Sequence, residues 1–444
     1  MHRIEYPNKL SNALRWLYKP YAFLDEAAAA HGPTFRMALP GAGNVLVTGD
    51  PDMIREIAAN RNLVAGKGVK AMRPLFGGDS LMMLDGEAHR SHRQLLTPPF
   101  QKDLIVQYDD LTVSATLDAI RQIPVGEPFS MFEVLRKITQ KIIVCIVFGV
   151  LPPEEEAQAL HLIHAFMTSF DNPLTLYLKP LHVNLGRHSP WGRITLNRAN
   201  LRGFILGQIK RFELTADNEN SLLAYLIAKG GMPEPDMVTE IFGMLMFGHD
   251  TTAVAMAWVF AHLYSHPDIV RGLAHEANHM PLLGACIQES ARLSPTVVQL
   301  LRAAAENLQV GGQPINKGEM VMPCLYLAHR NPAVFPKPGE FIPGRFMQTK
   351  GIHPPSGSPR PGGNPSPPGY GESPPPDAPH AYFPFGFGSR LCVGKPLAER
   401  QMPLIISTIY QNISLSLATS QPPEPVRYMV FIAPSGGTKM VRKS

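Results

Sequence analysis

A cysteine in a glycine-rich loop, directly ahead of a predicted helix, constrains this chain more than any other feature. The segment runs Phe383-Pro-Phe-Gly-Phe-Gly-Ser-Arg-Leu-Cys-Val-Gly394, and a helical pattern begins at Pro396. Glycines in such a loop can adopt positive φ and leave room for a flat ligand beside the backbone. A helix start favours a thiolate at Cys392, because the helix dipole and the free N–H groups stabilise negative charge. A lone thiolate suits one large metal cofactor better than zinc or an iron–sulfur cluster, and a buried structural cysteine is the simpler alternative.

Five positions of this loop resemble the haem-binding loop of the cytochrome P450 family. They occur within ten residues and in the order of the family pattern: Phe385, Gly388, Arg390, Cys392 and Gly394. The resemblance implies that Cys392 is the axial ligand of the iron in haem b, and that the other four residues help to bind the cofactor. It also implies a mainly α fold with small β-sheets, in which residues 1–444 form a single domain.

The composition is that of a chain able to build a large hydrophobic core. Of its 444 residues, 45% are hydrophobic and 17% are charged. The net charge of +5 is spread along the chain instead of being collected in a basic tail. This distribution argues against nucleic-acid binding.

The cysteines and the N-terminal segment indicate the compartment. The four cysteines are far apart and form no C-x-x-C pair, so disulfide bonds are not expected. Before Gly32, charged side chains interrupt every apolar run, so neither a signal peptide nor a membrane anchor is expected. We therefore expect a cytoplasmic protein.

Hydrophobic periodicity predicts helices over most of the chain, with a few short strands. The longest apolar pattern, from 233 to 265, is predicted to form one continuous helix. Residues 351–379 differ, because they are rich in proline, glycine and serine and contain almost no large apolar side chains. Such a composition cannot build a core and predicts a flexible insertion, either an inert surface loop or a docking segment for a partner.

Glu289 and Arg292 lie three residues apart on a predicted helix, so their side chains can form an ion pair on one face. Such pairs are usually solvated when they stand alone. Here the pair precedes a Phe-Ile-Pro-Gly-Arg-Phe segment that contains Arg345. The combination resembles the Glu-x-x-Arg helix and the Pro-x-Arg-Phe segment of the same family. It implies a buried ionic triad of Glu289, Arg292 and Arg345 behind the haem loop.

Polar residues interrupt the long apolar pattern in the run Phe247-Gly-His-Asp-Thr-Thr252. Buried polar groups need a reason, and a threonine can bond a backbone carbonyl and widen a helix locally. The run resembles the oxygen-activation segment of the family. This implies that Asp250 and Thr251 relay protons to dioxygen and that Gly248 lets the cofactor approach. Phe247 stands where the family usually has alanine or glycine, so a shifted groove can pass the relay role to Thr252.

His89 and Arg93 are four residues apart and share a helix face. A basic surface patch is the general explanation for such a pair. The family resemblance instead matches them to the helix that binds a haem propionate, and matches Arg302 and Arg390 to two further propionate contacts. Four cationic or hydrogen-bond donating groups are a chemically sensible set for two carboxylates.

The four resemblances together imply a haem-thiolate monooxygenase that inserts one oxygen atom of O2 into a C–H or C=C bond. An axial thiolate pushes electron density onto iron and favours O–O cleavage. Two electrons must come from outside, because the chain contains no flavin or iron–sulfur motif. The expected partner is a ferredoxin or flavodoxin with an NAD(P)H-dependent reductase.

Three other functions compete with this one. A hydrogen peroxide-dependent haem-thiolate peroxygenase typically lacks the acid–alcohol pair, and a non-catalytic haem-binding sensor has no need of it. Asp250 and Thr251 therefore argue against both. A His249–Asp250 metal pair of a phosphohydrolase is also conceivable, but no other cluster of histidine and aspartate supports it.

The family resemblance draws the substrate pocket from five segments of the chain. Their apolar side chains suit a medium-sized apolar molecule such as a terpenoid, a fatty acyl chain or a polyketide. The expected lining residues are Phe76, Leu81, Met82, Phe170, Met246, Phe247, Val297, Val298 and Leu300.

Overall fold

The computed structural model describes most of the chain. The described residues are 9–39, 43–69, 72–76, 80–170, 175, 181–215, 221–275, 280–347 and 381–443. The predicted insertion at 351–379 lies outside them. In the described part helices dominate and the sheets are small, as the sequence predicts.

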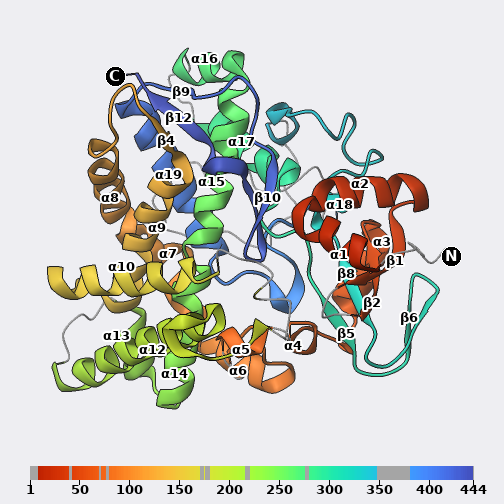
Figure 1. The fold of residues 1–444 in the computed structure, drawn as a ribbon, viewed down its shortest axis with the longest axis horizontal. Coiled ribbons are helices and arrows are strands. Elements are labelled where there is room, and N and C mark those ends of the chain that lie inside the picture. Colours follow the sequence, from red (N-terminus) through yellow and green to blue (C-terminus); the bar gives the residue numbers. More distant parts are fainter. Residues whose placement is uncertain are drawn as a thin grey trace, which may run out of the picture.

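Helices fill one side of the molecule in Figure 1 and continue through its middle. Those toward the left of the view are α8 (Asp109–Arg121), α9 (Met131–Phe148), α10 (Pro153–Thr168), α12 (Pro190–Thr215), α13 (Leu222–Lys229) and α14 (Glu234–Phe247), and α6 (Gly86–Leu96) lies at the lower edge. Those nearer the middle are α15 (Asp250–Tyr264), α17 (Met280–Leu293) and α19 (Lys395–Asn412). Shorter helices are α1 (Lys9–Tyr18), α2 (Pro20–His31), α3 (Pro51–Ala59), α4 (Ala65–Gly68), α5 (Arg73–Phe76), α7 (Lys102–Ile105), α16 (Pro267–His275) and α18 (Leu325–Ala328). Within the described ranges, every helix is too short or too polar to cross a membrane.

The largest sheet lies on the other side of the molecule, together with α1, α2 and α3 (Figure 1). Its strand order is β1-β2-β8-β5-β3, with β1 and β2 antiparallel and β2 and β8 parallel. These strands are β1 (Thr34–Leu39), β2 (Gly43–Thr48), β3 (Leu63–Val64), β5 (Arg302–Ala304) and β8 (Met320–Pro323). The smaller sheets contain β4 (Pro128–Ser130), β12 (Lys439–Arg442) and β9 (Leu415–Leu417); β10 (Pro425–Tyr428) and β11 (Phe431–Pro434); and β6 (Leu308–Val310) and β7 (Gln313–Ile315).

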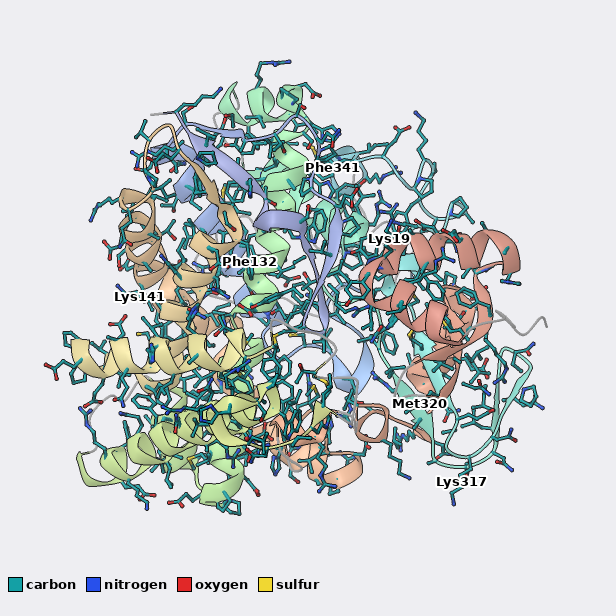
Figure 2. All side chains as sticks on the ribbon, viewed as in Figure 1. Lys19, Phe132, Lys141, Lys317, Met320 and Phe341 are labelled. Atoms are coloured by element: carbon teal, nitrogen blue, oxygen red, sulfur yellow. The ribbon has the colours of Figure 1, made fainter. Side chains whose placement is uncertain are left out.

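The helix α15 lies inside the core, because it is buried on nearly all of its faces. It packs against α9, α17 and β11. The indole N–H of Trp258 donates to the carbonyl of Ile432 at 3.0 Å, which ties α15 to β11 without leaving a buried donor unpaired. Figure 2 shows side chains filling the space between the helices, with Phe132 of α9 among them.

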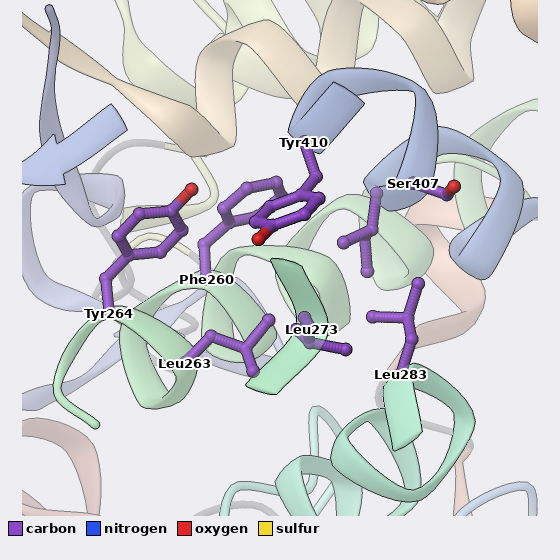
Figure 3. Close-up of a pocket in the computed structure, with 8 residues that line it drawn as sticks. Phe260, Leu263, Tyr264, Leu273, Leu283, Ser407 and Tyr410 are labelled. Carbon is purple, nitrogen blue, oxygen red and sulfur yellow. The ribbon is translucent and has the colours of Figure 1, made fainter. Parts of the chain in front are cut away.

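A small cavity remains beside α15, between Phe260, Leu273, Leu283 and Tyr410 (Figure 3). Its volume of about 10 Å³ is close to the space that one water molecule needs. The side chains around it are almost all apolar. It is therefore a packing gap of the core and is far too small to hold a substrate.

The prediction of one continuous helix from 233 to 265 is wrong at one place. The chain forms α14 and then α15, separated by a turn at Gly248 and His249. The hydroxyl of Thr251 donates to the carbonyl of Phe247 at 2.8 Å, across the interruption. Such a side-chain bond competes with the regular helix ladder and is a known cause of local distortion. The interruption gives α15 its own N-terminus, and the polar run of the sequence lies there.

Candidate active site

A backbone hydrogen bond closes the loop around Cys392, whose N–H donates to the carbonyl of Phe385 at 2.9 Å. Gly386 and Gly388 have φ of +77° and +61°, which other residues rarely adopt. Gly394 instead has φ of −79°, and a Cβ there would meet the Cys392 sulfur at an ordinary 3.9 Å. Positive φ therefore explains two of the three glycines and does not explain Gly394.

The thiol of Cys392 lies at the N-terminus of α19, where the N–H groups of Gly394 and Lys395 hydrogen-bond it. Burial raises the pKa of the thiol, and these N–H groups together with the nearby Arg93 charge oppose that rise. The Cys392 side chain is nevertheless accessible. A ligand can therefore reach a sulfur that the protein largely surrounds.

Three guanidiniums and one imidazole gather near this loop, from α6, β5 and the loop itself. Burial, aided by the neighbouring Arg390 charge, lowers the pKa of Arg302 to about 10 and that of His89 to about 4. Burial likewise lowers the pKa of Arg93 and of Arg390. His89 is therefore neutral at pH 7 and serves as a hydrogen-bonding group, while the three arginines crowd positive charge into a partly desolvated space. We call His89, Arg93, Arg302 and Arg390 the cationic cluster.

Asp85 balances part of this charge. Its carboxylate pairs with Arg390 at 2.5 Å and accepts the N–H of Gly66 at 3.0 Å. Among the residues that the structure describes, no other carboxylate lies within ion-pairing distance of Arg93, Arg302 or Arg390. Three positive charges thus face one negative charge, which makes the cationic cluster a site for anions.

The family comparison decides what this arrangement belongs to. A family model described as Cytochrome P450 matches residues 12–441. The chain belongs to the cytochrome P450 family. This confirms the resemblance drawn from the cysteine loop and makes the protein a haem-thiolate monooxygenase.

Similar proteins and similar solved structures are also P450s. This P450 is 26% identical over 446 residues to cytochrome P450 138 of Mycobacterium tuberculosis, with 98% of this chain and 94% of that protein covered. It is 24% identical over 427 residues to cytochrome P450 137 of the same species, with 92% and 83% covered. A cyanobacterial CYP120A1 with retinoic acid bound shares 22% identity and a TM-score of 0.81, with 97% and 96% covered. P450BioI, in a complex with an acyl carrier protein ligated to hexadec-9Z-enoic acid, shares 18% identity and a TM-score of 0.72, with 95% and 97% covered. The two structures confirm the mainly α fold with small sheets.

The residues of the site fit haem b, the cofactor of this family. Its iron takes an axial ligand, and Cys392 supplies an accessible sulfur at a helix N-terminus. Its two propionates are carboxylates, and the cationic cluster has a surplus of positive charge. Because Asp85 already engages Arg390, the surplus belongs mainly to Arg93 and Arg302. The separate roles of Phe385, Gly388 and Gly394 in cofactor binding stay predictions.

Gly248 has a packing reason that the sequence analysis did not consider. A Cβ at this position would lie 2.6 Å from the carbonyl oxygen of Met244 and 2.8 Å from Cδ1 of Ile143 in α9. Close contact between the helix interruption and α9 therefore requires glycine here. The expected role of Gly248 in admitting the cofactor stays a prediction.

The two threonines of the polar run differ in their surroundings. Thr251 is half-buried and bonded to the Phe247 carbonyl, whereas Thr252 is buried with 7% of its surface exposed. Asp250 is fully buried, and its carboxylate accepts the hydroxyl of Tyr428 at 3.0 Å. Burial alone would raise the pKa of Asp250, but His249, and after it Arg136 and Tyr428, hold the pKa below its usual value. Asp250 is therefore ionised at neutral pH.

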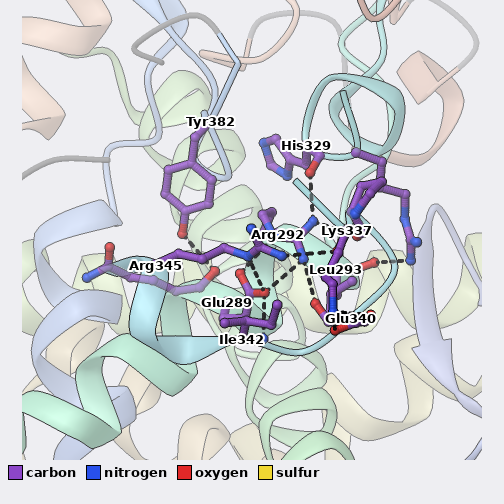
Figure 4. A network of polar contacts seen from close by, with 12 residues as sticks. Glu289, Arg292, Leu293, His329, Lys337, Glu340, Ile342, Arg345 and Tyr382 are labelled. Atoms are coloured by element: carbon purple, nitrogen blue, oxygen red, sulfur yellow. Dashed lines mark hydrogen bonds and ion pairs between the residues drawn. The ribbon is translucent and has the colours of Figure 1, made fainter. Parts of the chain in front are cut away.

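The structure brings Glu289, Arg292 and Arg345 together (Figure 4). Arg292 donates from Nε and Nη2 to the two oxygens of Glu289 at 2.7 and 2.8 Å, and Arg345 Nε donates at 3.2 Å. The N–H of Ile342 adds a fourth bond at 2.9 Å. Arg292 also donates to the carbonyls of His329, Pro338 and Glu340. We call this set the saturated network, because its carboxylate and its Arg292 guanidinium are fully used.

The expected pocket residues lie in several parts of the described structure. Phe76, Phe170 and Met246 are buried in the core cluster shared by α9, α10, α12 and α14, and Leu81, Met82 and Phe247 pack against its edge. Val298 is buried in the core beneath the largest sheet, Leu300 packs near the cysteine loop, and Val297 is half-buried. The rings of Phe76 and Phe247, far apart in sequence, have centroids 4.7 Å apart. That these residues line the substrate pocket stays a prediction.

The sequence analysis missed four polar residues around the site: Asp85, Arg136, Glu240 and Tyr428. Each finds its partner far along the chain. Tyr428 bonds a residue 178 positions away, and Glu240 bonds His92, 148 positions away. No local spacing reveals such pairs. Of the four, only Glu240 had a sequence signal, because it is a charged residue inside an apolar helical pattern.

Proposed function

We propose that this P450 oxygenates an elongated apolar molecule, a fatty acyl chain or a terpenoid, in the cytoplasm. Its electrons come from a ferredoxin or flavodoxin with an NAD(P)H-dependent reductase. The observation that carries the substrate proposal is the contact between Phe76 and Phe247 beside the helix interruption. Phe247, whose carbonyl accepts the Thr251 hydroxyl, belongs to this aromatic pair, and two rings at such a place favour a slim chain over a broad fused-ring molecule.

The ligands of the two structural neighbours support this choice of substrate. Retinoic acid is bound to CYP120A1, and hexadec-9Z-enoic acid, ligated to an acyl carrier protein, is bound to P450BioI. Both are long and apolar. A carrier-bound acyl chain is therefore a second form in which the substrate can arrive.

The residues divide the chemical work among them. A bound haem with a thiolate ligand supplies dioxygen activation and O–O bond cleavage. Cys392 provides the thiolate, and the N–H groups of Gly394 and Lys395 stabilise its charge. Thr251 places a hydroxyl at the interruption between α14 and α15, where it can accept a proton and pass one on. Asp250, the neighbouring carboxylate, exchanges protons with it.

The test of the proton relay is the replacement Thr251→Ala. Without its hydroxyl, substrate should still bind with a near-normal spin shift and NAD(P)H should still be consumed. Product per NAD(P)H should fall sharply and hydrogen peroxide should rise, because protons no longer arrive in time. Thr252→Ala distinguishes the two threonines. Thr408→Ala is the matched control, since its hydroxyl makes the same bond to a carbonyl four residues back, at 2.7 Å, in α19.

Full coupling in both the Thr251 and the Thr252 variants would contradict the relay and favour the hydrogen peroxide-dependent peroxygenase. The substrate proposal has a separate test. The protein is titrated with a C16 fatty acid, a linear isoprenoid acid and a compact bicyclic terpene. The two linear acids should produce the high-spin shift at lower concentrations than the terpene does. Tighter binding of the compact terpene would contradict the elongated substrate.

A further inference from the structure

Asp250 is held by residues from elements remote in sequence. Its side chain is fully buried at the first residue of α15. The hydroxyl of Tyr428 donates to Oδ2 of Asp250 at 3.0 Å, and Nη1 of Arg136 donates to the Tyr428 oxygen at 3.3 Å. Nε2 of His249 lies 3.2 Å from the other oxygen, Oδ1. Arg136 of α9, Tyr428 of β10 and His249 of the interruption are thus the charged or titratable groups that face this carboxylate.

A tight hairpin brings Tyr428 to this place. It is the last residue of β10 and pairs with Phe431 at the start of β11. Met429, in the turn, has φ of +53°. β11 packs against α15, so the tip of the hairpin reaches the N-terminal end of that helix. The ring of Phe132 packs edge-on against the Tyr428 ring, with centroids 5.3 Å apart, and restricts its direction.

The Tyr428 bond holds Asp250 whatever the protonation of His249. Nδ1 of His249 donates to the carbonyl of Leu245 at 2.6 Å, and its Nε2 lies 3.2 Å from the amide nitrogen of Gln140. In the neutral tautomer Nε2 therefore accepts from Gln140 and donates nothing to Asp250. Consistently, Oδ1 of Asp250 makes no hydrogen bond within the described part of the chain. Tyr428 therefore fixes Oδ2 in either state of His249, and with a neutral His249 the other oxygen, Oδ1, is left without a donor.

The chain from Asp250 through Tyr428 to Arg136 positions the carboxylate and does not conduct protons. Burial and the adjacent Asp250 charge raise the pKa of Tyr428 far above its usual value, so the phenol keeps its proton. An arginine guanidinium does not release a proton in a protein. Protons therefore do not reach Asp250 through Tyr428 and Arg136.

We propose that Tyr428 is a positioning residue for oxygen activation. Its hydroxyl anchors Oδ2 of Asp250 and thereby leaves Oδ1 available to exchange protons in the relay to Thr251. This inference rests on the proposed relay role of Asp250. It assigns a role in oxygen activation to a residue of the β10–β11 hairpin, 178 positions after Asp250 in the chain.

The test is Tyr428→Phe in the full chain, loaded with haem and supplied with its redox partners. The variant removes one oxygen atom and keeps the ring that packs on Phe132. The substrate-induced spin shift should stay unchanged. Product per NAD(P)H should fall several-fold, and the ratio of product formation rates in H2O and D2O should rise, because proton delivery becomes slower. An unchanged coupling and an unchanged isotope ratio would overturn the proposal.

Two further variants separate positioning from a general structural effect. Tyr410→Phe removes a hydroxyl that donates to the carbonyl of Val270 at 3.1 Å, away from the site, and should alter neither readout. The double variant Tyr428→Phe/Asp250→Asn should be no worse coupled than Asp250→Asn alone, because Tyr428 acts through Asp250. A further loss in the double variant would overturn the proposal.

Failure of the inference and failure of the proposed relay give different results. If Asp250→Asn leaves coupling intact, the relay itself is wrong. If Asp250→Asn uncouples the enzyme while Tyr428→Phe does not, the relay stands and the positioning role of Tyr428 is wrong.

Discussion

The saturated network and the cationic cluster are both built from buried arginines, yet they differ in charge balance. In the saturated network, Glu289 accepts four hydrogen bonds and Arg292 donates every bond it can use to a carboxylate or a carbonyl. In the cationic cluster, Asp85 is the carboxylate that pairs with Arg390, while burial lowers the pKa of Arg302 and Arg93. The first set of charges is complete within the protein, and the second needs anions from outside.

Charge balance therefore distinguishes a structural charge cluster from a ligand site. Burying a charge costs free energy that only a partner of opposite charge offsets. A network that supplies its own partners stabilises the fold with or without a ligand. A cluster with surplus charge costs free energy until a ligand brings carboxylates, so its charge is balanced only when the ligand is bound. The following variants test this difference in charge balance.

The largest effect is expected at the ligand itself. Cys392→Ala should abolish the thiolate-type Soret shift of the reduced carbon monoxide complex, because no other cysteine lies in the loop. The measurement is a reduced carbon monoxide difference spectrum. Alanine variants of Cys145, Cys286 and Cys324 serve as controls and should keep the shift. Retention of the shift in the Cys392→Ala variant would contradict the assignment of Cys392 as the axial ligand.

The next largest effect is expected in the saturated network. Glu289→Gln leaves the buried Arg292 charge uncompensated and should lower the free energy of unfolding by about 3–5 kcal/mol. Urea unfolding of the haem-free protein measures this. Glu340→Gln is the control, because its side chain is exposed and pairs with exposed Lys337; its cost should stay below about 1 kcal/mol. Equal costs for the two variants would refute the distinction.

Arg302→Gln should behave in the opposite way. The cationic cluster has surplus charge, so removal of one cation should leave the free energy of unfolding of the haem-free protein unchanged or slightly higher. Haem should dissociate about tenfold faster or more, because a charge-assisted hydrogen bond to a propionate is lost. Haem transfer to an acceptor protein measures the rate. Destabilisation of the haem-free protein as large as that of Glu289→Gln would contradict the comparison.

The smallest effect concerns Glu240, a buried carboxylate that has no guanidinium partner among the described residues. It accepts hydrogen bonds from His92 Nδ1 at 2.8 Å and from the N–H of Leu81 at 2.6 Å. Burial raises the pKa of Glu240 to about 7 from the value of 4.5 expected in the unfolded chain. The stability that this group contributes is therefore fully present below pH 4.5 and is lost as the pH rises through 7.

Glu240→Gln cannot ionise and should remove this loss. The free energy of unfolding of the variant, relative to the natural protein, should rise between pH 5 and pH 8, by at most about 1.4 kcal/mol per pH unit within the titration window. Urea unfolding at the two pH values measures the difference, with exposed Glu234→Gln as the control. A difference that is the same at both pH values would contradict the prediction.

Much of the active site could be predicted because its signals are local in the sequence. The cysteine loop compresses ligand, glycines and arginine into ten residues, and the helix that follows it supplies the N–H groups near the sulfur. The i, i+3 spacing of Glu289 and Arg292 likewise specifies one helix face before any fold is known. Periodicity was enough to predict a mainly helical chain, because an amphipathic or apolar repeat is also a short-range property.

Tertiary structure decided what sequence spacing cannot encode. The need for glycine at position 248 depends on α9, whose Ile143 leaves no room for a Cβ there. The orientation of the Asp250 carboxylate depends on a hydrogen bond from a tyrosine that a hairpin delivers 178 residues later. Local sequence therefore determined which chemistry the chain carries, namely the thiolate loop, the ion pair and the acid–alcohol run. The fold alone decided which charges are balanced, because balance depends on partners that only long-range packing brings within a few ångströms.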